Sequence, residues 1–163
     1  MLTVPNVLLV SGPTEGRATI SMRTRHGQAD YLAHLTSVPL FAQCTKAELK
    51  SLARHTSDIT AEPEQVLIKE GQGAYDFFVI VSGEAEVSRE GRVVAHLKKG
   101  DYFGELGLLA PALRDATVTA RSPMELIVLA QWDFEQALAE APGMTRRLLT
   151  GMAHRLRQLD QHL

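Results

Sequence analysis

The chain has 163 residues, of which 45% are hydrophobic and 22% charged, and its formal net charge at pH 7 is −2. This length leaves room for one folded domain and a short extension. The nearly balanced charge disfavours a general nucleic-acid binder, which needs a strongly basic surface. The single cysteine, Cys44, cannot form an internal disulfide and is expected to fill space beside a helix start. No Cys/His cluster is present, so we expect no structural zinc site.

Residues 1–28 are interpreted as a tail or an added strand. They contain a short β-like run at 7–10, a group of turn-forming residues, and a basic stretch at 23–26. The apolar beginning is too short to span a membrane and lacks the basic region of a secretory signal. We therefore expect a cytoplasmic protein with no membrane partner, whose domain covers residues 29–163.

Two short helices are predicted before residue 56. Apolar residues between 31 and 35 recur at helical spacing, and Pro39 ends that pattern. Thr45 and Glu48 then form the pattern of a capping box, in which each residue accepts a backbone N–H of the other. The second helix begins at this box and buries the face that carries Leu49 and Leu52.

A series of short apolar runs follows between residues 58 and 130, separated by glycines and a proline: 66–68, 77–81, 85–87, 93–97, 117–120 and 125–129. Glu90 and Gly91 between two of these runs predict a hairpin turn. This punctuation favours a mainly β fold of the α+β class, a jelly-roll barrel or β-roll flanked by N-terminal helices and two C-terminal helices.

Those two C-terminal helices are predicted at 131–139 and 144–163. Trp132 in the first is expected to bury its ring where the helix meets the roll. The second carries an apolar stripe that consists of Met144, Leu148, Met152, Leu156, Leu159 and Leu163. The stripe fits packing on the roll and a homodimer seam equally well.

The segment from Phe103 to Pro111 predicts a single helical turn, because it is too helical for a hairpin and too short for a packing helix. Its unpaired N–H groups and the two glycines Gly104 and Gly107 suit a closely approaching phosphate. Arg114 follows at a distance that lets its guanidinium grip the same phosphate. Glu105 would repel a phosphate but can accept a sugar hydroxyl. These features together favour a cyclic mononucleotide.

The stretch FGELGLLAPALRDATV resembles the phosphate-binding motif of the cyclic nucleotide-binding domains found in the catabolite activator protein and in protein kinase A regulatory subunits. The resemblance extends over about residues 30–163 and includes IKEGQG and FFVIVSG. It implies that the domain binds a cyclic nucleotide. It also implies site residues: Arg114 at the phosphate, Glu105 at the ribose 2′-hydroxyl, the backbone N–H groups of Gly104, Leu106, Gly107 and Asp115 around the phosphate, Ala116 and Thr117 beside them, Val87 and Leu97 as an apolar wall, and Arg155 on a final helix that acts as a lid.

Three positions depart from the motif of this family. Gly107 replaces an alanine, Leu113 replaces a proline, and Asp115 stands where a small residue is common. Adjacent side chains in an extended segment point in opposite directions, so Asp115 is expected to face outward while Arg114 faces inward. Several cGMP-selective relatives carry threonine at this point. Its absence favours cAMP over cGMP as the ligand.

Two other readings stay open, whereas an enzyme is not expected. Arg114 and Glu105 alone would fit a structural ion pair in a ligand-free interaction module. A metal-dependent enzyme on a β-roll needs a His-x-His motif, which the sequence lacks, and no nucleophile elbow or P-loop is present. The chain also fits the sensor part of a transcription regulator without its DNA-binding domain. The sequence does not identify an effector protein.

Overall fold

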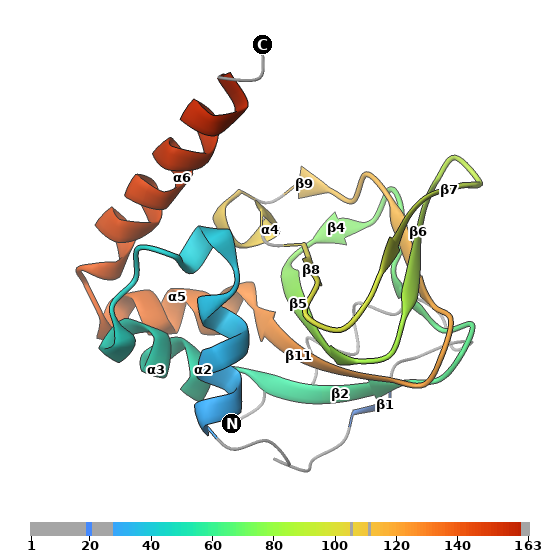
Figure 1. Ribbon diagram of the computed structural model, residues 1–163, viewed down its shortest axis with the longest axis horizontal. Coiled ribbons are helices and arrows are strands. Elements are labelled where there is room, and N and C mark those ends of the chain that lie inside the picture. The colour runs from blue at the N-terminus through green and yellow to red at the C-terminus, as the bar shows by residue number, and fades with distance from the viewer. Residues whose placement is uncertain (1–18, 21–27, 105, 111, 161–163) are drawn as a thin grey trace.

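A computed structural model describes residues 19–20, 28–104, 106–110 and 112–160. Its β-structure consists of two antiparallel sheets and a small ribbon (Figure 1). In spatial order, the five-stranded sheet contains β1 (Thr19–Ile20), β2 (Ser57–Ala61), β11 (Met124–Ala130), β5 (Asp76–Ser82) and β8 (Tyr102–Phe103). The four-stranded sheet contains β3 (Val66–Ile68), β10 (Thr117–Ala120), β6 (Ala85–Arg89) and β7 (Arg92–Leu97), and the ribbon pairs β4 (Gly73–Ala74) with β9 (Ala112–Leu113).

The central strands β5 and β11 are buried on both faces along most of their length, and this explains their continuous apolar runs. Successive side chains of a strand point to opposite faces. Phe78 and Ile80 therefore pack against the other sheet, inside the roll, while Phe77 and Val79 pack against the helices. Inside the roll, Phe78 stacks on Phe103 with ring centroids 4.8 Å apart.

Helices cover the outer face of the five-stranded sheet. They are α2 (Gln28–Thr36), the 3₁₀ turn η1 (Pro39–Phe41), α3 (Lys46–Arg54), α5 (Gln131–Glu140) and α6 (Met144–Asp160). The predicted capping box at the start of α3 is confirmed. Thr45 Oγ1 accepts the N–H of Glu48 at 3.2 Å, and Glu48 Oε1 accepts the N–H of Thr45 at 2.8 Å. The predicted roll with flanking helices is thus the fold of this chain.

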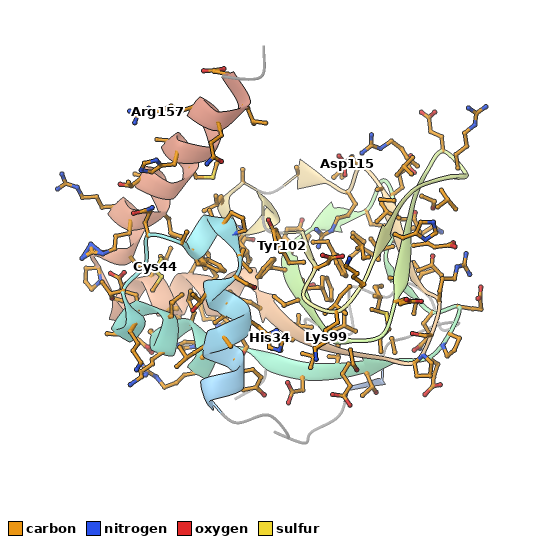
Figure 2. All side chains as sticks on the ribbon, in the orientation of Figure 1. His34, Cys44, Lys99, Tyr102, Asp115 and Arg157 are labelled. Carbon is orange, nitrogen blue, oxygen red and sulfur yellow. The ribbon has the colours of Figure 1, made fainter. Side chains whose placement is uncertain are left out.

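The structure tests the predictions for the hairpin turn, for Cys44 and for Trp132. The hairpin turn is confirmed, with φ of 52° at Glu90 and 80° at Gly91. Cys44 packs half-buried against the helix-side core (Figure 2), and burial raises the pKa of its thiol to about 11. The expected burial of Trp132 is wrong, because its side chain is 59% exposed at the start of α5.

The apolar stripe of α6 divides into two parts. Met144 and Leu148 are buried against the helical layer, whereas Leu156 and Leu159 are exposed and Leu163 lies outside the described residues. In the predicted tail, β1 adds a short strand to the edge of β2, while the run at 7–10 lies outside the described residues.

The described helices include none that is long and apolar enough to cross a membrane. Within the same part of the chain, no group of three metal-ligating side chains occurs.

Candidate functional site

The predicted single helical turn is α4 (Leu106–Leu109), and Gly104 leads into it from β8. Gly104 has a φ of +86°, a left-handed conformation that favours glycine. A Cβ at this position would lie 2.6 Å from the carbonyl oxygen of Asp76 and 2.7 Å from Nη1 of Arg114. The fold therefore brings Gly104 next to the guanidinium of Arg114, as the phosphate site requires.

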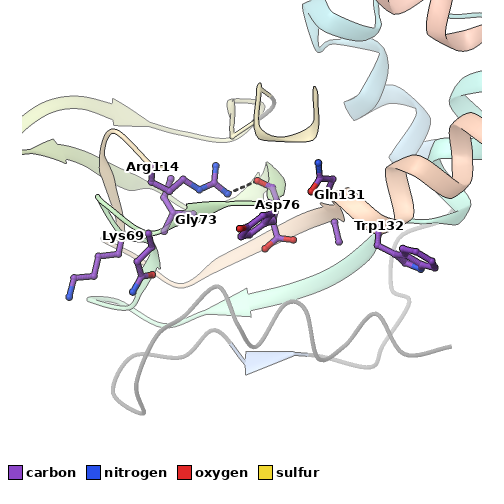
Figure 3. Close-up of a pocket in the computed structure, with 10 residues that line it drawn as sticks. Lys69, Gly73, Asp76, Arg114, Gln131 and Trp132 are labelled. Carbon is purple, nitrogen blue, oxygen red and sulfur yellow. Dashed lines mark hydrogen bonds between the residues drawn. The ribbon is translucent and has the colours of Figure 1, made fainter. Parts of the chain in front are cut away.

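Arg114 is buried and held in one direction by the surrounding backbone. Its Nη2 donates a hydrogen bond to the carbonyl oxygen of Asp76 at 2.7 Å (Figure 3). Its own N–H donates to the carbonyl of Gln72, and its carbonyl accepts the N–H of Gly71. The strand β9, which directly precedes Arg114, also pairs with β4. The segment that carries Arg114 is therefore hydrogen-bonded to the loop before β5 through several consecutive residues.

Asp76 is a residue of this site that the sequence analysis missed. It is the first residue of β5, and its side chain is only 3% exposed. Burial raises the pKa of its carboxyl to about 7, although the charge of Arg114 lowers it, and Asp133 raises it further. In the sequence, an aspartate before an apolar run resembles an ordinary turn residue, so the pattern carries no signal of this environment.

The three residues after Arg114 point in different directions. The side chain of Asp115 is 89% exposed, and Arg89 binds it from outside through a hydrogen bond to the backbone carbonyl and an ion pair of 3.5 Å. Ala116 is buried in the roll. Thr117 Oγ1 accepts the N–H of Glu70 at 3.0 Å. Arg114 therefore faces the interior and Asp115 faces solvent, in the alternation expected of an extended segment.

Val87 and Leu97 lie on the adjacent strands β6 and β7. Both are partly buried and pack against the core inside the roll. Val87 pairs with Val118 of β10, so its side chain belongs to the same sheet as the segment that follows Arg114. Their placement fits the apolar wall that the resemblance implied.

Other predicted site residues are not brought together in this way. Glu105 lies outside the described residues, as do the side chains of Leu106 and Arg155. The N–H of Gly107 donates to the carbonyl of Gly104 at 3.1 Å in this structure, and its contact with a phosphate stays a prediction.

The predicted lid is not closed in this structure. Helix α6 leans away from the roll (Figure 1), and Figure 2 shows Arg157 near its projecting end, far from Asp115. The N-terminal part of α6 packs on η1 instead.

The cavity beside this site has a volume of about 330 Å³. Of the predicted binding residues that the structure describes, only Arg114 lines it. The contacts between Gly104 and Arg114 lie outside the lining of this cavity, apart from Arg114 itself. The cavity is a neighbouring compartment that shares one wall with the site.

Comparison with known proteins agrees with this geometry. The family model of the cyclic nucleotide-binding domain matches residues 59–141, about half of the chain. The cAMP-dependent protein kinase regulatory subunit of Yarrowia lipolytica is 37% identical over 117 residues, which cover 71% of this chain and 31% of that protein. The chain thus spans about a third of the length of this curated relative.

Two solved structures share the fold. The N-terminal domain of a transcriptional regulator from Streptomyces coelicolor A3(2) superimposes with a TM-score of 0.73 at 27% identity, covering 78% of this chain and 95% of that one. PfPKA-R (141-441) with bound cAMP superimposes with a TM-score of 0.60 at 26% identity, covering 82% of this chain and 47% of that one. The chain belongs to the cyclic nucleotide-binding domain family.

Proposed function

We propose that this chain is a cytosolic regulatory domain that binds cAMP between α4 and the segment 114–117. Arg114 pairs with the cyclic phosphate, and Glu105 accepts the ribose 2′-hydroxyl. Backbone N–H groups of Gly104, Leu106 and Asp115 surround the phosphate. The observation that carries the proposal is the buried guanidinium of Arg114, held directly beside a glycine whose missing side chain leaves the backbone accessible.

Physical reasons support an anionic ligand at this place. A guanidinium has planar, paired donors that match a phosphate, and its orientation is already determined by the bond to Asp76. The exposed carboxylate of Asp115 is directed away from the interior, so it does not repel the phosphate strongly. Val87 and Leu97 provide apolar surface for the nucleotide's ring system.

The choice of cAMP is supported by two observations. Asp115 occupies the position at which cGMP-selective relatives carry threonine. The similar regulatory subunit of Yarrowia lipolytica belongs to a cAMP-dependent kinase, and the similar PfPKA-R structure contains cAMP. Binding of cGMP with lower affinity is the corresponding expectation.

In this proposal, residues 29–163 form the sensing domain, and α6 transmits the presence of the ligand. Its exposed leucines, Leu156 and Leu159, offer apolar surface that can be buried when the helix docks. A ligand that binds better to the docked form shifts the population toward it. Arg155 would then lie near the nucleotide. The same face, in helix 144–163, also suits a homodimer seam, and a separate effector protein would read the change.

A second function is favoured by one observation. The similar structure from Streptomyces coelicolor A3(2) is the N-terminal domain of a transcriptional regulator, and this chain matches nearly all of it. The chain would then be the sensor part of such a regulator. Its nucleotide site would be the same, and the difference would lie in the effector to which α6 responds.

Calorimetric titration with cAMP and with cGMP tests the site. Arg114→Ala should weaken cAMP binding about 30-fold or more, because truncation of one partner of a buried charge pair costs about 2–5 kcal/mol. Arg92→Ala is the matched control, since Arg92 is an exposed arginine of β7 and should leave the affinity unchanged. Equal affinity in Arg114→Ala would overturn the assigned role. No binding of either nucleotide to the unaltered chain would favour the ligand-free interaction module.

A further inference from the structure

A second compartment lies between the loop that precedes β5 and the junction of β11 with α5. Its volume of about 330 Å³ is at the lower end of the range of about 300–1,000 Å³ for small-molecule sites. Lys69, Gln72 and Gly73 contribute one wall, and Ala130, Gln131 and Trp132 contribute the opposite wall. Asp76 lies between them (Figure 3). The residues assigned to the nucleotide contribute only Arg114, so this is a separate compartment.

The carboxyl of Asp76 is an unusual group to find facing such a cavity. Its side chain is almost fully buried and lines the cavity, and the guanidinium of Arg114 donates to the backbone carbonyl of this residue. Among the described residues, none donates a hydrogen bond to this carboxylate. A buried charged group without a hydrogen-bond partner is costly, and folded proteins normally pair such groups. The cavity in front of Asp76 therefore has room for a ligand group that can pair with this carboxyl.

Two exposed aromatic side chains stand at the same cavity. Tyr75 is 55% exposed and Trp132 is 59% exposed. The ring of Tyr75 lies across Gly73, since a Cβ on that glycine would come within 2.5 Å of Tyr75 Cε2. Large aromatic side chains exposed at a cavity that also contains a carboxylate are the groups that bind organic cations, because the faces of aromatic rings attract positive charge.

We propose that this compartment binds a small organic cation, an ammonium group on an apolar body, with Asp76 as its counter-ion and with Tyr75 and Trp132 as its aromatic walls. Two cations also line the compartment. The guanidinium of Arg114 is directed to the carbonyl of Asp76, and the ammonium end of Lys69 points away from the compartment (Figure 3). An anionic ligand would instead meet the carboxylate of Asp76.

The proposal includes a pH dependence that helps to test it. Only the ionised form of Asp76 attracts a cation, and burial holds the pKa of this carboxyl at about 7. The charges of Arg114 and Asp133 act on this carboxyl, and the titratable residues Lys69 and Tyr75 also line the cavity. Binding of an amine should therefore strengthen between pH 6 and pH 8, in which range amines stay protonated.

Trp132 is the only tryptophan of the chain, so its fluorescence reports on this compartment directly. We expect phenethylamine, titrated without any nucleotide at pH 8, to change this fluorescence in a saturable manner at millimolar concentrations. The neutral 2-phenylethanol and the anionic 3-phenylpropionate should bind at least about tenfold more weakly. Asp76→Asn should weaken phenethylamine binding to a similar degree. Glu135→Gln, an exposed carboxylate of the same helix α5 as Trp132, should not.

Several outcomes would overturn the proposal: no saturable response to phenethylamine, equal binding of the neutral or anionic analogue, or unchanged binding in Asp76→Asn. Trp132→Ala provides a second variant that is safe for folding, because the ring is mostly exposed. Calorimetry should show weaker phenethylamine binding in that variant, and unchanged binding would contradict the aromatic wall. All of these measurements are independent of cAMP binding, so their failure would leave the proposed nucleotide site intact.

Discussion

The segment around Arg114 and the outer part of α6, residues 153–160, differ sharply in how they are held. Arg114 is buried. Its N–H and carbonyl bind the loop before β5, and its guanidinium donates to the carbonyl of Asp76 at the start of β5. In the outer part of α6, Leu156 and Leu159 are 59% and 64% exposed. The proposed binding residue is thus held in advance of the ligand, while the proposed transmitting helix still has apolar surface to bury.

This difference suggests that the Arg114 segment binds the ligand while α6 changes its position in response. A preorganised arginine loses little conformational entropy when a phosphate arrives. A helix end with exposed leucines can gain about 1.5–3 kcal/mol for each leucine that becomes fully buried, which is enough to shift a population. Mutations in the two regions should therefore have different effects on stability.

The largest expected effect contrasts the two parts of α6. Leu148→Ala removes a side chain that is 3% exposed and should lower the free energy of unfolding by about 2–5 kcal/mol. Leu156→Ala on the same helix should change it by no more than about 0.5 kcal/mol. Urea denaturation measures both. A large cost for Leu156→Ala that depends on protein concentration would show that this face is a dimer seam.

Asp76→Asn should change how stability depends on pH. The ordinary carboxyl pKa of 3.8 applies to the unfolded chain, and about 7 applies to the folded chain. Between these values the folded protein keeps a proton that the unfolded chain has lost, so stability falls as pH rises. Between pH 5 and pH 8 the ionisation of Asp76 should lower the free energy of unfolding by about 2–3 kcal/mol. Asp76→Asn should not show this decrease. Identical pH profiles of wild type and variant in urea denaturation would contradict the buried, proton-holding carboxyl.

Gly104→Ala should destabilise the segment that contacts Arg114. An alanine in the left-handed conformation costs about 1–2 kcal/mol, and its Cβ must also displace the carbonyl of Asp76 or the guanidinium. Gly100→Ala serves as a control, because Gly100 has a similar φ of +92° with no atom close to the added Cβ. The two variants should lose similar stability from the backbone, but only Gly104→Ala should also weaken cAMP binding.

The smallest effect is expected at Asp115. Asp115→Asn removes one carboxylate from an exposed pair with Arg89, so the free energy of unfolding should change by no more than about 0.5 kcal/mol. Its outward direction also predicts little change in cAMP affinity, and at most a slight gain from the lost negative charge. A strong gain in affinity would mean that this side chain turns toward the ligand.

The predictions from sequence were most reliable where the pattern was local. The runs at 66–68 and 117–120 coincide with β3 and β10, because a turn-forming residue, Gly71 or Pro123, follows each apolar run closely. The strands β4, β8 and β9 were missed, since two residues are too few to show any period. The five residues of β2 were missed as well, because a short run with only two apolar side chains gives a weak signal.

In the site, too, the sequence predicted what depends on residues close together in the chain and missed what depends on distant ones. The spacing from Gly104 to Arg114 pointed to a shared phosphate, and the fold places these residues together. Asp76 escaped notice because its importance arises from a contact between residues 38 positions apart in the chain. Trp132 was expected to bury its ring where the helix meets the roll, yet its side chain is exposed to solvent.

By itself, the sequence determined that the chain forms a β-roll with flanking helices, that it carries the cyclic-nucleotide motif, and that Arg114 and Asp115 face opposite ways. These follow from residue periodicity, turn chemistry and a contiguous motif, all of which act over short distances. Only the tertiary structure decided that Asp76 is buried beside a cavity, that Trp132 is exposed there, and that α6 is packed at one end and open at the other. Burial depends on which segments, far apart in the sequence, pack against one another, and a local sequence pattern does not contain that information.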